Sequence, residues 1–300
     1  RGVIAIRALR AAKELGYQVA SVYSTVDKDQ KHLKLSDEAI CIGPAISKDS
    51  YLNEAAIISA AELVGADAIY PGYGFLAENS AFAEKCNESG FKFIGPDPKV
   101  IEIMGDKIRA KELIESLGVP VVPGYTGKID SQDQIEKVVN DIGYPVIVKA
   151  TAGGGGKGMR VVNEENELWD SVVSAQNEAQ RAFGNGEVFI EKYLKKPRHI
   201  EIQVFGDGHG KVVHLYSRDC SLQRRYQKII EEAPAKNLPS DKLEEIQQIC
   251  VKACSELKYE GAGTLEFLYE NNEFYFIEMN TRIQVAVSYT HLTLPTIYSV

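Results

Sequence analysis

Four consecutive glycines, residues 153–156, lie between two short apolar runs at 146–150 and 159–162. Apolar runs of this length on either side of glycines are typical of two strands joined by a turn, so the segment predicts a β-hairpin with a glycine-rich tip. Glycine lets successive backbone amides turn toward one anion, and Lys149 and Lys157 flank the tip with positive charge. We interpret the tip as a phosphate cradle that closes over a nucleotide. A flexible linker is the plainer alternative.

This glycine loop is not a Walker A phosphate loop. Lys157 is followed by Gly158, where a Walker A motif has Ser or Thr, and the next element has the pattern of a strand rather than of a helix. The nucleotide fold is therefore expected to be of another type.

Helical and strand patterns alternate through the first hundred residues. Helices are expected at 4–16, 52–64 and 77–88, and strands at 18–23, 67–70 and 91–94. This alternation predicts a parallel sheet covered by helices. We expect an N-terminal Rossmann-like domain over residues 1–103 that lacks its first strand, because no strand pattern precedes the opening helix.

The rest of the chain divides into a connector and two smaller units. A helical connector over 104–120 ends in glycine and proline punctuation. The glycine hairpin belongs to a unit over 121–194, with helices at 131–142 and 164–183 and strands at 146–150, 159–162 and 187–191. The unit over 195–285 has an antiparallel pattern, with strands at 200–205, 212–217, 263–269 and 273–279 and a helix at 243–257. The expected fold class is therefore α/β followed by α+β.

Two glutamates interrupt the last pair of apolar strands. Glu266 and Glu278 lie on either side of the Asn271-Asn272 turn, where a buried carboxylate is costly unless a cation satisfies it. With Asn280 they offer hard oxygen ligands suited to Mg²⁺. A two-residue turn would pair Glu266 with Ile277 and put Glu278 on the opposite face, so one metal requires a bulge or a three-residue turn. Solvent-facing charges on an edge hairpin are the alternative.

A dense cationic loop is expected over residues 217–228, which contain Arg218, Arg224, Arg225 and Lys228. The chain has 34 Lys and Arg against 42 Asp and Glu, a net charge of −8, so a local cationic cluster predicts a site for a small anion. A solvated run of charge is the alternative. The acidic balance argues against a nucleic-acid or anionic-membrane partner, because the broad basic surface of such binders is missing.

Apolar runs and cysteines indicate a cytoplasmic protein. No apolar run approaches the roughly 18 residues of a membrane span, and no leader pattern opens the chain. The five cysteines form no C-x-x-C pair, which favours reduced thiols. Cys250 and Cys254 lie one helical turn apart, so we expect them to pack within their helix.

Seven motifs in this order resemble the biotin carboxylase subunit or domain of the acetyl-CoA carboxylase type, a member of the ATP-grasp family. They are YPGYGFLAEN at 70–79, MGDK at 104–107, the glycine loop, EKYL at 191–194, PRHIE at 197–201, QRR at 223–225 and EMNTRIQV at 278–285. The resemblance implies a pre-ATP-grasp domain followed by an ATP-grasp fold whose glycine loop is a mobile lid. It implies carboxylation of biotin by ATP and bicarbonate through carboxyphosphate, with Mg²⁺ or Mn²⁺.

The resemblance also implies partners and site residues. The biotin would be carried by a biotin carboxyl carrier protein, with carboxyltransferase subunits and a homodimer in the full-length protein, as in fatty acid biosynthesis. ATP would be bound by Lys107, Lys149, Gly154, Gly155, Gly156, Glu191, Lys192, Leu194, His199, Gln223 and Leu268. The metal would be bound by Glu266, Glu278 and Asn280, and bicarbonate by the catalytic residues Lys228, Arg282, Gln284 and Val285.

The match ends after Val285. Ala286 stands where the resemblance implies a general-base glutamate, and the family's enolate-stabilising arginine is not found. We expect a chain truncated at both ends, a foreign tail over 286–300, and turnover at least roughly a hundredfold below that of the family, since general-base catalysis is typically of that size. Tyr226 stands where many relatives carry histidine.

Two other functions stay open. One is a different ATP-grasp ligase such as carbamoyl-phosphate synthetase, which would share the nucleotide and metal groups but not the stretch 282–285. The other is a nucleotide-binding remnant without catalysis.

Overall fold

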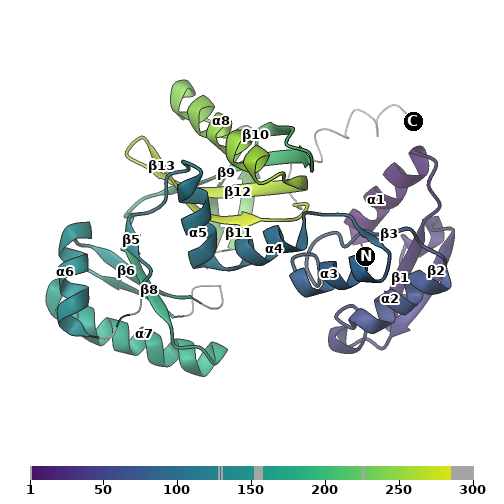
Figure 1. Cartoon of the computed structure of the whole chain (residues 1–300), viewed down its shortest axis with the longest axis horizontal. Coiled ribbons are helices and arrows are strands. Elements are labelled where there is room, and N and C mark those ends of the chain that lie inside the picture. The colour runs from purple at the N-terminus through teal and green to yellow at the C-terminus, as the bar shows by residue number, and fades with distance from the viewer. Residues whose placement is uncertain (1, 128, 130, 152–157, 225–226, 285–300) are drawn as a thin grey trace.

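The computed structural model describes residues 2–127, 129, 131–151, 158–224 and 227–284. The chain forms three lobes (Figure 1). A central lobe lies between an N-terminal lobe at one end and, at the other, a lobe that carries the glycine hairpin and that we call the lid lobe. Gly154, Gly155, Gly156, Tyr226, Val285 and the tail 286–300 lie outside the described residues.

The N-terminal lobe alternates helices and short strands. They are α1 (Gly2–Glu14), β1 (Ala20–Ser24), β2 (Glu38–Gly43), α2 (Glu54–Leu63), β3 (Ala68–Ile69), α3 (Ser80–Glu88) and β4 (Lys92–Phe93). β1 pairs with β2 and β3 with β4, in both cases parallel, as the alternation predicted. The described strands form two two-stranded sheets rather than one. β2 was not expected, because Glu38–Gly43 is largely exposed and lacks a clear alternation.

Two helices link this lobe to the central lobe. α4 (Pro98–Gly105) was not predicted, and α5 (Lys107–Ser116) lies within the expected connector. The Asp106 carboxylate caps α5 by accepting hydrogen bonds from the amides of Ile108 and Arg109, both at 3.0 Å. Met104 and Ile114 enter the core of the central lobe, so the connector packs on that lobe along its length.

The lid lobe is built on the predicted hairpin. Its elements are β5 (Gly124–Tyr125), α6 (Gln132–Ile142), β6 (Val146–Ala150), β7 (Met159–Val162), α7 (Leu168–Phe183) and β8 (Val188–Lys192). The sheet order is β5-β8-β6-β7, with every pair antiparallel. The two hairpin strands have the predicted bounds. Val148 and Val172 are fully buried in the core between the sheet and α7.

The central lobe is a five-stranded antiparallel sheet crossed by one long helix. Its elements are β9 (Arg198–Asp207), β10 (Val212–Arg224), β11 (Gln227–Glu232), α8 (Ser240–Glu256), β12 (Glu260–Glu270) and β13 (Glu273–Asn280), and the sheet order is β11-β10-β9-β12-β13. Cys250 and Cys254 are fully buried in α8 as free thiols, which confirms that they are packing residues.

The cationic segment over 217–228 was expected to be a loop, and this expectation is wrong. Its described residues continue β10 to Arg224 and begin β11 at Gln227. Charge suggested a loop, but Arg218 is only 1% exposed and pairs with the carboxylate of Glu201 on the neighbouring strand β9. A buried partner across the sheet therefore lets a charged residue occupy a strand.

The hairpin between β12 and β13 contains the bulge that one metal site required. Asn271 and Asn272 have φ angles of 54° and 64°, which is typical of a two-residue hairpin turn. The register pairs Phe267 with Phe276 and then Glu266 with Glu278, so Ile277 is the extra residue. The bulge brings both glutamates to the same cross-strand position.

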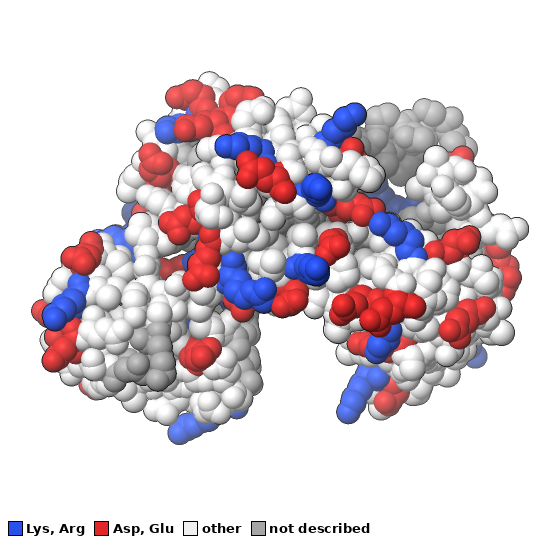
Figure 2. Space-filling view, viewed as in Figure 1, with Lys and Arg blue, Asp and Glu red and all other residues white. Residues whose placement is uncertain are grey.

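On the face shown in Figure 2, basic side chains are scattered among acidic ones and form no broad basic surface. Across the part of the chain that the structure describes, every helix is too short or too polar to cross a membrane.

Candidate active site

The carboxylate of Glu266 is the centre of a buried polar cluster in the central sheet. Its side chain is 4% exposed, and His199 Nε2 lies 2.6 Å from Oε2. Lys228 Nζ and Asn280 Nδ2 each lie 2.6 Å from Oε1. Burial raises the pKa of Glu266, but the hydrogen bond from His199 and the ammonium of Lys228 outweigh burial and lower it to about 2. Glu266 is therefore ionised at neutral pH.

Lys228 bridges two buried carboxylates. Its Nζ lies 2.6 Å from Glu201 Oε2 as well as from Glu266 Oε1. Burial lowers the pKa of Lys228, but both carboxylates raise it further, so the ammonium stays charged. Glu201 also binds Arg218, whose Nη1 donates to Gln203 Oε1 at 3.0 Å.

Sequence reasoning assigned no role to Arg218, Glu201 or Gln203. The signal was the alternation along β9, in which His199, Glu201 and Gln203 share one face while apolar residues occupy the other. Three polar residues at every second position of a buried strand predict a polar cluster with partners on the next strand.

His199 is oriented by hydrogen bonds on both ring nitrogens. Gln223 Nε2 lies 3.0 Å from Nδ1, and Nε2 faces Glu266. An amide nitrogen donates, so Nδ1 accepts and Nε2 carries the hydrogen that Glu266 accepts; this tautomer is assigned from the network. Leu268 pairs with His199 across β12 and β9. The three residues predicted to meet the ribose region and nucleotide therefore lie together.

Arg282 lies at the junction of the central and N-terminal lobes. Its Nε donates to Glu78 Oε2 at 2.7 Å, and its Nη2 donates to Asn280 Oδ1 at 2.8 Å. The same carboxylate accepts the amide of Thr281 at 3.1 Å. Glu78 belongs to the motif at 70–79, so that motif reaches the site by pairing with Arg282. Gln284 is half-buried, and its Nε2 has no hydrogen-bond partner among the described residues.

A second cluster lies where α5 meets the lid sheet. Lys149 Nζ on β6 lies 2.6 Å from Glu191 Oε2 on β8, and Lys111 on α5 forms an ion pair with Oε1 of the same carboxylate. Burial and the nearby ammonium of Lys107 lower the pKa of Lys149 to about 8. Burial, Lys149 and Lys107 lower the pKa of Lys111 to about 7. The carboxylate of Glu278 opposes the shift of Lys149, because a nearby negative charge favours the charged ammonium.

Lys192 and Leu194, predicted to meet adenine, follow on from Glu191. Lys192 Nζ donates to the carbonyl oxygens of Gly143 at 2.8 Å and Tyr144 at 3.1 Å, which ties β8 to the turn between α6 and β6. Leu194 is half-buried just beyond β8. An adenine role for these side chains stays a prediction.

The predicted metal ligands suit a hard divalent cation. Glu278 is exposed to solvent opposite Glu266. Partial burial and the charge of Glu266 raise the pKa of Glu278, and Lys107 opposes this. A cation between the two carboxylates would remove their repulsion, and the Asn280 amide adds a third oxygen. The donor set therefore fits Mg²⁺.

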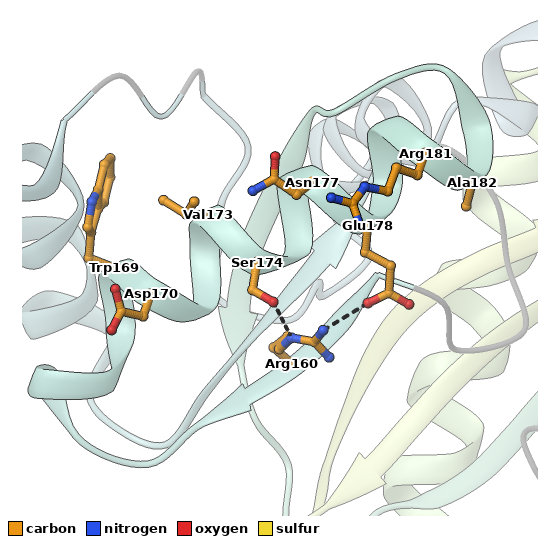
Figure 3. Close-up of a pocket in the computed structure, with 9 residues that line it drawn as sticks. All are labelled: Arg160, Trp169, Asp170, Val173, Ser174, Asn177, Glu178, Arg181 and Ala182. Atoms are coloured by element: carbon orange, nitrogen blue, oxygen red, sulfur yellow. Dashed lines mark hydrogen bonds and ion pairs between the residues drawn. The ribbon is translucent and has the colours of Figure 1, made fainter.

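Two pockets among the described residues are lined by other side chains. The larger, about 1080 Å³, is an open groove on the outside of the lid lobe along α7, where Arg160 contacts Ser174 and Glu178 (Figure 3). The smaller, about 520 Å³, lies between the start of α5 and the lid residues Thr151 and Glu187. Neither holds the clusters above.

Comparison with known proteins identifies the parts of the chain. Residues 1–101 match the family model "Biotin carboxylase, N-terminal domain", and residues 106–293 match "Carbamoyl-phosphate synthase L chain, ATP binding domain". The chain is 56% identical to the biotin carboxylase of Haemophilus influenzae over 286 residues, which are 95% of this chain and 64% of that protein. It is 52% identical to biotin carboxylase 1 of Bacillus subtilis over 298 residues, or 99% of this chain and 66% of that one.

Solved structures give the same result. A complex of Campylobacter jejuni biotin carboxylase described as "beta-gamma-ATP" has a TM-score of 0.89 and 52% identity, over 97% of this chain and 66% of that one. The biotin carboxylase domain dimer of Hydrogenobacter thermophilus 2-oxoglutarate carboxylase, with MgADP, ADP and bicarbonate, has a TM-score of 0.85 and 50% identity, over 95% of this chain and 63% of that one. The chain spans just under two thirds of the length of these relatives.

Proposed function

Because this chain belongs to the biotin carboxylase family, we propose that it supplies the nucleotide, metal and bicarbonate site of an ATP-dependent ligase that carboxylates biotin. The observation that carries the proposal is the bulged hairpin, which pairs Glu266 with Glu278 beside Lys228 and Asn280. Carboxylates, an amide and a fixed ammonium on one surface suit a divalent cation together with an anionic substrate.

Separate groups of residues would bind the phosphates, the adenine, the ribose region and the metal ion of the nucleotide. Lys107, Lys149 and the glycine loop with Gly154, Gly155 and Gly156 would hold phosphates. Glu191, Lys192 and Leu194 would meet adenine, and His199 and Gln223 would meet the ribose region. Leu268 would also bind the nucleotide. Glu266, Glu278 and Asn280 would hold Mg²⁺ or Mn²⁺, which when bound neutralises charge on the transferring phosphoryl group.

Bicarbonate would be held by Lys228, Arg282, Gln284 and the Val285 backbone. Bicarbonate is a weak nucleophile, so the site must fix its oxygen in line with the γ-phosphate. Lys228 is suited to this because two carboxylates fix its ammonium, and Arg282 because Glu78 and Asn280 hold its guanidinium. The carboxyphosphate product would need exclusion of water by the lid before it reacts with biotin.

We propose the wider assembly by analogy with the relatives. Biotin would arrive on a biotin carboxyl carrier protein, the carboxyl group would pass to carboxyltransferase subunits, and the complete protein would form a homodimer in the cytoplasm. A dimer is named for the Hydrogenobacter thermophilus domain. These partners and this location are proposals for the chain within its complete protein.

One observation favours a second candidate. The model that matches 106–293 is named for carbamoyl-phosphate synthase, so the ATP-binding half alone would suit another ATP-grasp ligase. The match of residues 1–101 to the biotin carboxylase N-terminal model favours the biotin enzyme.

The test is MgATP hydrolysis with bicarbonate, measured with and without free biotin. Two proteins are compared. One is this chain, and the other is this chain fused to the segments of the Haemophilus influenzae relative that lie outside the matched region. We expect biotin to stimulate turnover in the longer protein and a Lys228→Met variant to abolish the stimulation. Bicarbonate-dependent hydrolysis that biotin does not change would instead support another ATP-grasp ligase.

A further inference from the structure

We propose that Lys111 is a positioning residue, which keeps the buried carboxylate of Glu191 paired and so frees Lys149 to bind the phosphates of a nucleotide. The inference rests on the proposed nucleotide site and adds a residue to it. Lys111 lies on α5, outside the lid lobe and outside every motif that the sequence singled out.

The geometry places one carboxylate between two ammonium groups. Glu191 is 2% exposed; Lys149 contacts its Oε2 and Lys111 its Oε1. Each lysine therefore contacts a different oxygen of the Glu191 carboxylate. If either lysine turns away, the carboxylate keeps the other.

Exposure separates the roles of the two lysines. The Lys111 side chain is 10% exposed, and its ammonium lies 5.0 Å from the centroid of the Phe189 ring. The Lys149 side chain is 22% exposed and lies on β6 at the base of the glycine hairpin. Lys149 is thus the more accessible of the two to a bound ligand, whereas Lys111 is confined between α5 and β8.

Removing a partner from a buried ion pair is costly, because the remaining charge has lost its water and gained nothing. With Lys111 present, Lys149 can exchange Glu191 for a phosphate without leaving that carboxylate unpaired. Without Lys111, Glu191 would compete with the phosphate for the single remaining ammonium. The competition involves only ligands that carry phosphate.

The alternative is that Lys111 merely fastens α5 to the lid sheet. That role would weaken the binding of every ligand at the proposed nucleotide site alike, or would lower stability alone. Dependence on the phosphates of the ligand therefore separates the two roles.

The experiment measures dissociation constants of ADP and adenosine by calorimetry at pH 6, where both lysines are charged, for this chain and its variants. In Lys111→Met we expect ADP to bind about tenfold more weakly, a change of about 1.4 kcal/mol, while adenosine binding is unchanged. Lys111→Arg should keep the wild-type ratio of ADP to adenosine affinity. Arg109→Met is the matched control, because Arg109 lies on the same helix and pairs with Glu102 at the surface.

A second variant tests the competition directly. Adding Glu191→Gln to Lys111→Met should restore the ratio of ADP to adenosine affinity, because no carboxylate then holds Lys149. If Lys111→Met does not fold by circular dichroism, Lys111→Gln replaces it in both measurements. Equal losses for ADP and adenosine, or no loss for ADP, would overturn the inference. A wild-type chain that binds neither ligand would overturn the proposed function and this inference with it.

Discussion

The lid cluster and the central cluster use the same residue types in opposite proportions. In the lid cluster one carboxylate, Glu191, lies between Lys111 and Lys149. In the central cluster one ammonium, Lys228, lies between Glu201 and Glu266. The first has spare positive charge. In the second, Arg218 and Lys228 balance Glu201 and Glu266, so the spare negative charge is that of Glu278 opposite Glu266. The two clusters together suit a ligand that brings phosphates and a divalent cation.

The excess charge also decides which groups can titrate. The lid lysines have lowered pKa values, about 8 for Lys149 and about 7 for Lys111, because burial and neighbouring ammonium groups act against their charge. In the central cluster the pKa of Lys228 is raised and that of Glu266 is lowered to about 2, so both stay charged. The charge of the lid cluster therefore changes near neutral pH, whereas the charge of the central cluster does not.

The largest expected effect comes from breaking the central cluster. Glu201→Ala leaves Arg218 buried without its carboxylate, so the free energy of unfolding should fall by about 3–5 kcal/mol. Urea denaturation measures this. Glu232→Ala, at an exposed position of β11, is the control and should change it by less than about 0.5 kcal/mol. A Glu201→Ala change as small as that of the control would show that the cluster is not held by paired charges.

Acid should break the same cluster. Glu266 has a folded pKa of about 2 against an ordinary 4.5, so its stabilisation is present above pH 4.5 and is lost as the pH falls toward 2. The loss should be about 3 kcal/mol, since one pKa unit is worth about 1.4 kcal/mol. Unfolding free energies measured from pH 6 to pH 2 test this. Glu266→Gln should flatten that slope, and an unchanged slope would contradict the assignment.

Alkali should weaken the lid cluster instead. Lys149 loses its proton as the pH rises through about 8, and Lys111, which keeps Glu191 paired, loses its proton as the pH rises through about 7. ADP affinity should therefore fall by at least about tenfold between pH 7 and 9, the change expected for one titrating group. Adenosine affinity should not follow, and Lys149→Met should reduce the dependence. The measurement is ADP binding by calorimetry across that range; an ADP affinity that is flat in the wild-type chain would refute the shift.

The smallest expected effect concerns the bulge. Deleting Ile277 should remove the bulge and leave Glu278 opposite Glu266, because the residues on both sides of Ile277 already pair across the two strands. Mg²⁺ should therefore still improve ADP binding in the deletion variant, to within about 1 kcal/mol of its effect in the wild-type chain. Ile277→Ala keeps the extra residue and serves as the control. An Mg²⁺ effect that is lost only in the deletion variant would show that the extra residue, and not the pairing of the two glutamates, forms the metal site.

Local pattern was enough to predict the hairpin and much of the helix content. β6 and β7 have the predicted bounds, because glycines and apolar runs mark both ends. The need for a bulge between Glu266 and Glu278 followed from counting residues around a turn. The sequence could not decide between a bulge and a three-residue turn. In the folded sheet Phe267 pairs with Phe276 and packs against it, and this pairing leaves Ile277 as the bulged residue.

The missed residues all act across the fold. Lys111 meets Glu191 from 80 residues away, and Glu78 meets Arg282 across two lobes. No spacing rule connects such positions. A weaker signal existed for Lys111, since it lies on the buried side of α5 with Ala110. A lysine on the buried side of a helix requires an anionic partner.

The lid cluster has spare positive charge and the central cluster has spare negative charge. The most direct test of this contrast is ADP binding with and without Mg²⁺ in two single variants. Lys149→Met should weaken ADP under both conditions, because it removes a phosphate partner. Glu278→Gln should weaken ADP only when Mg²⁺ is present, because it removes an oxygen that would hold the cation. Calorimetry of the two variants beside the wild-type chain decides the matter. A Glu278→Gln loss that is the same without Mg²⁺, or a Lys149→Met chain that binds ADP like the wild type, would contradict the account.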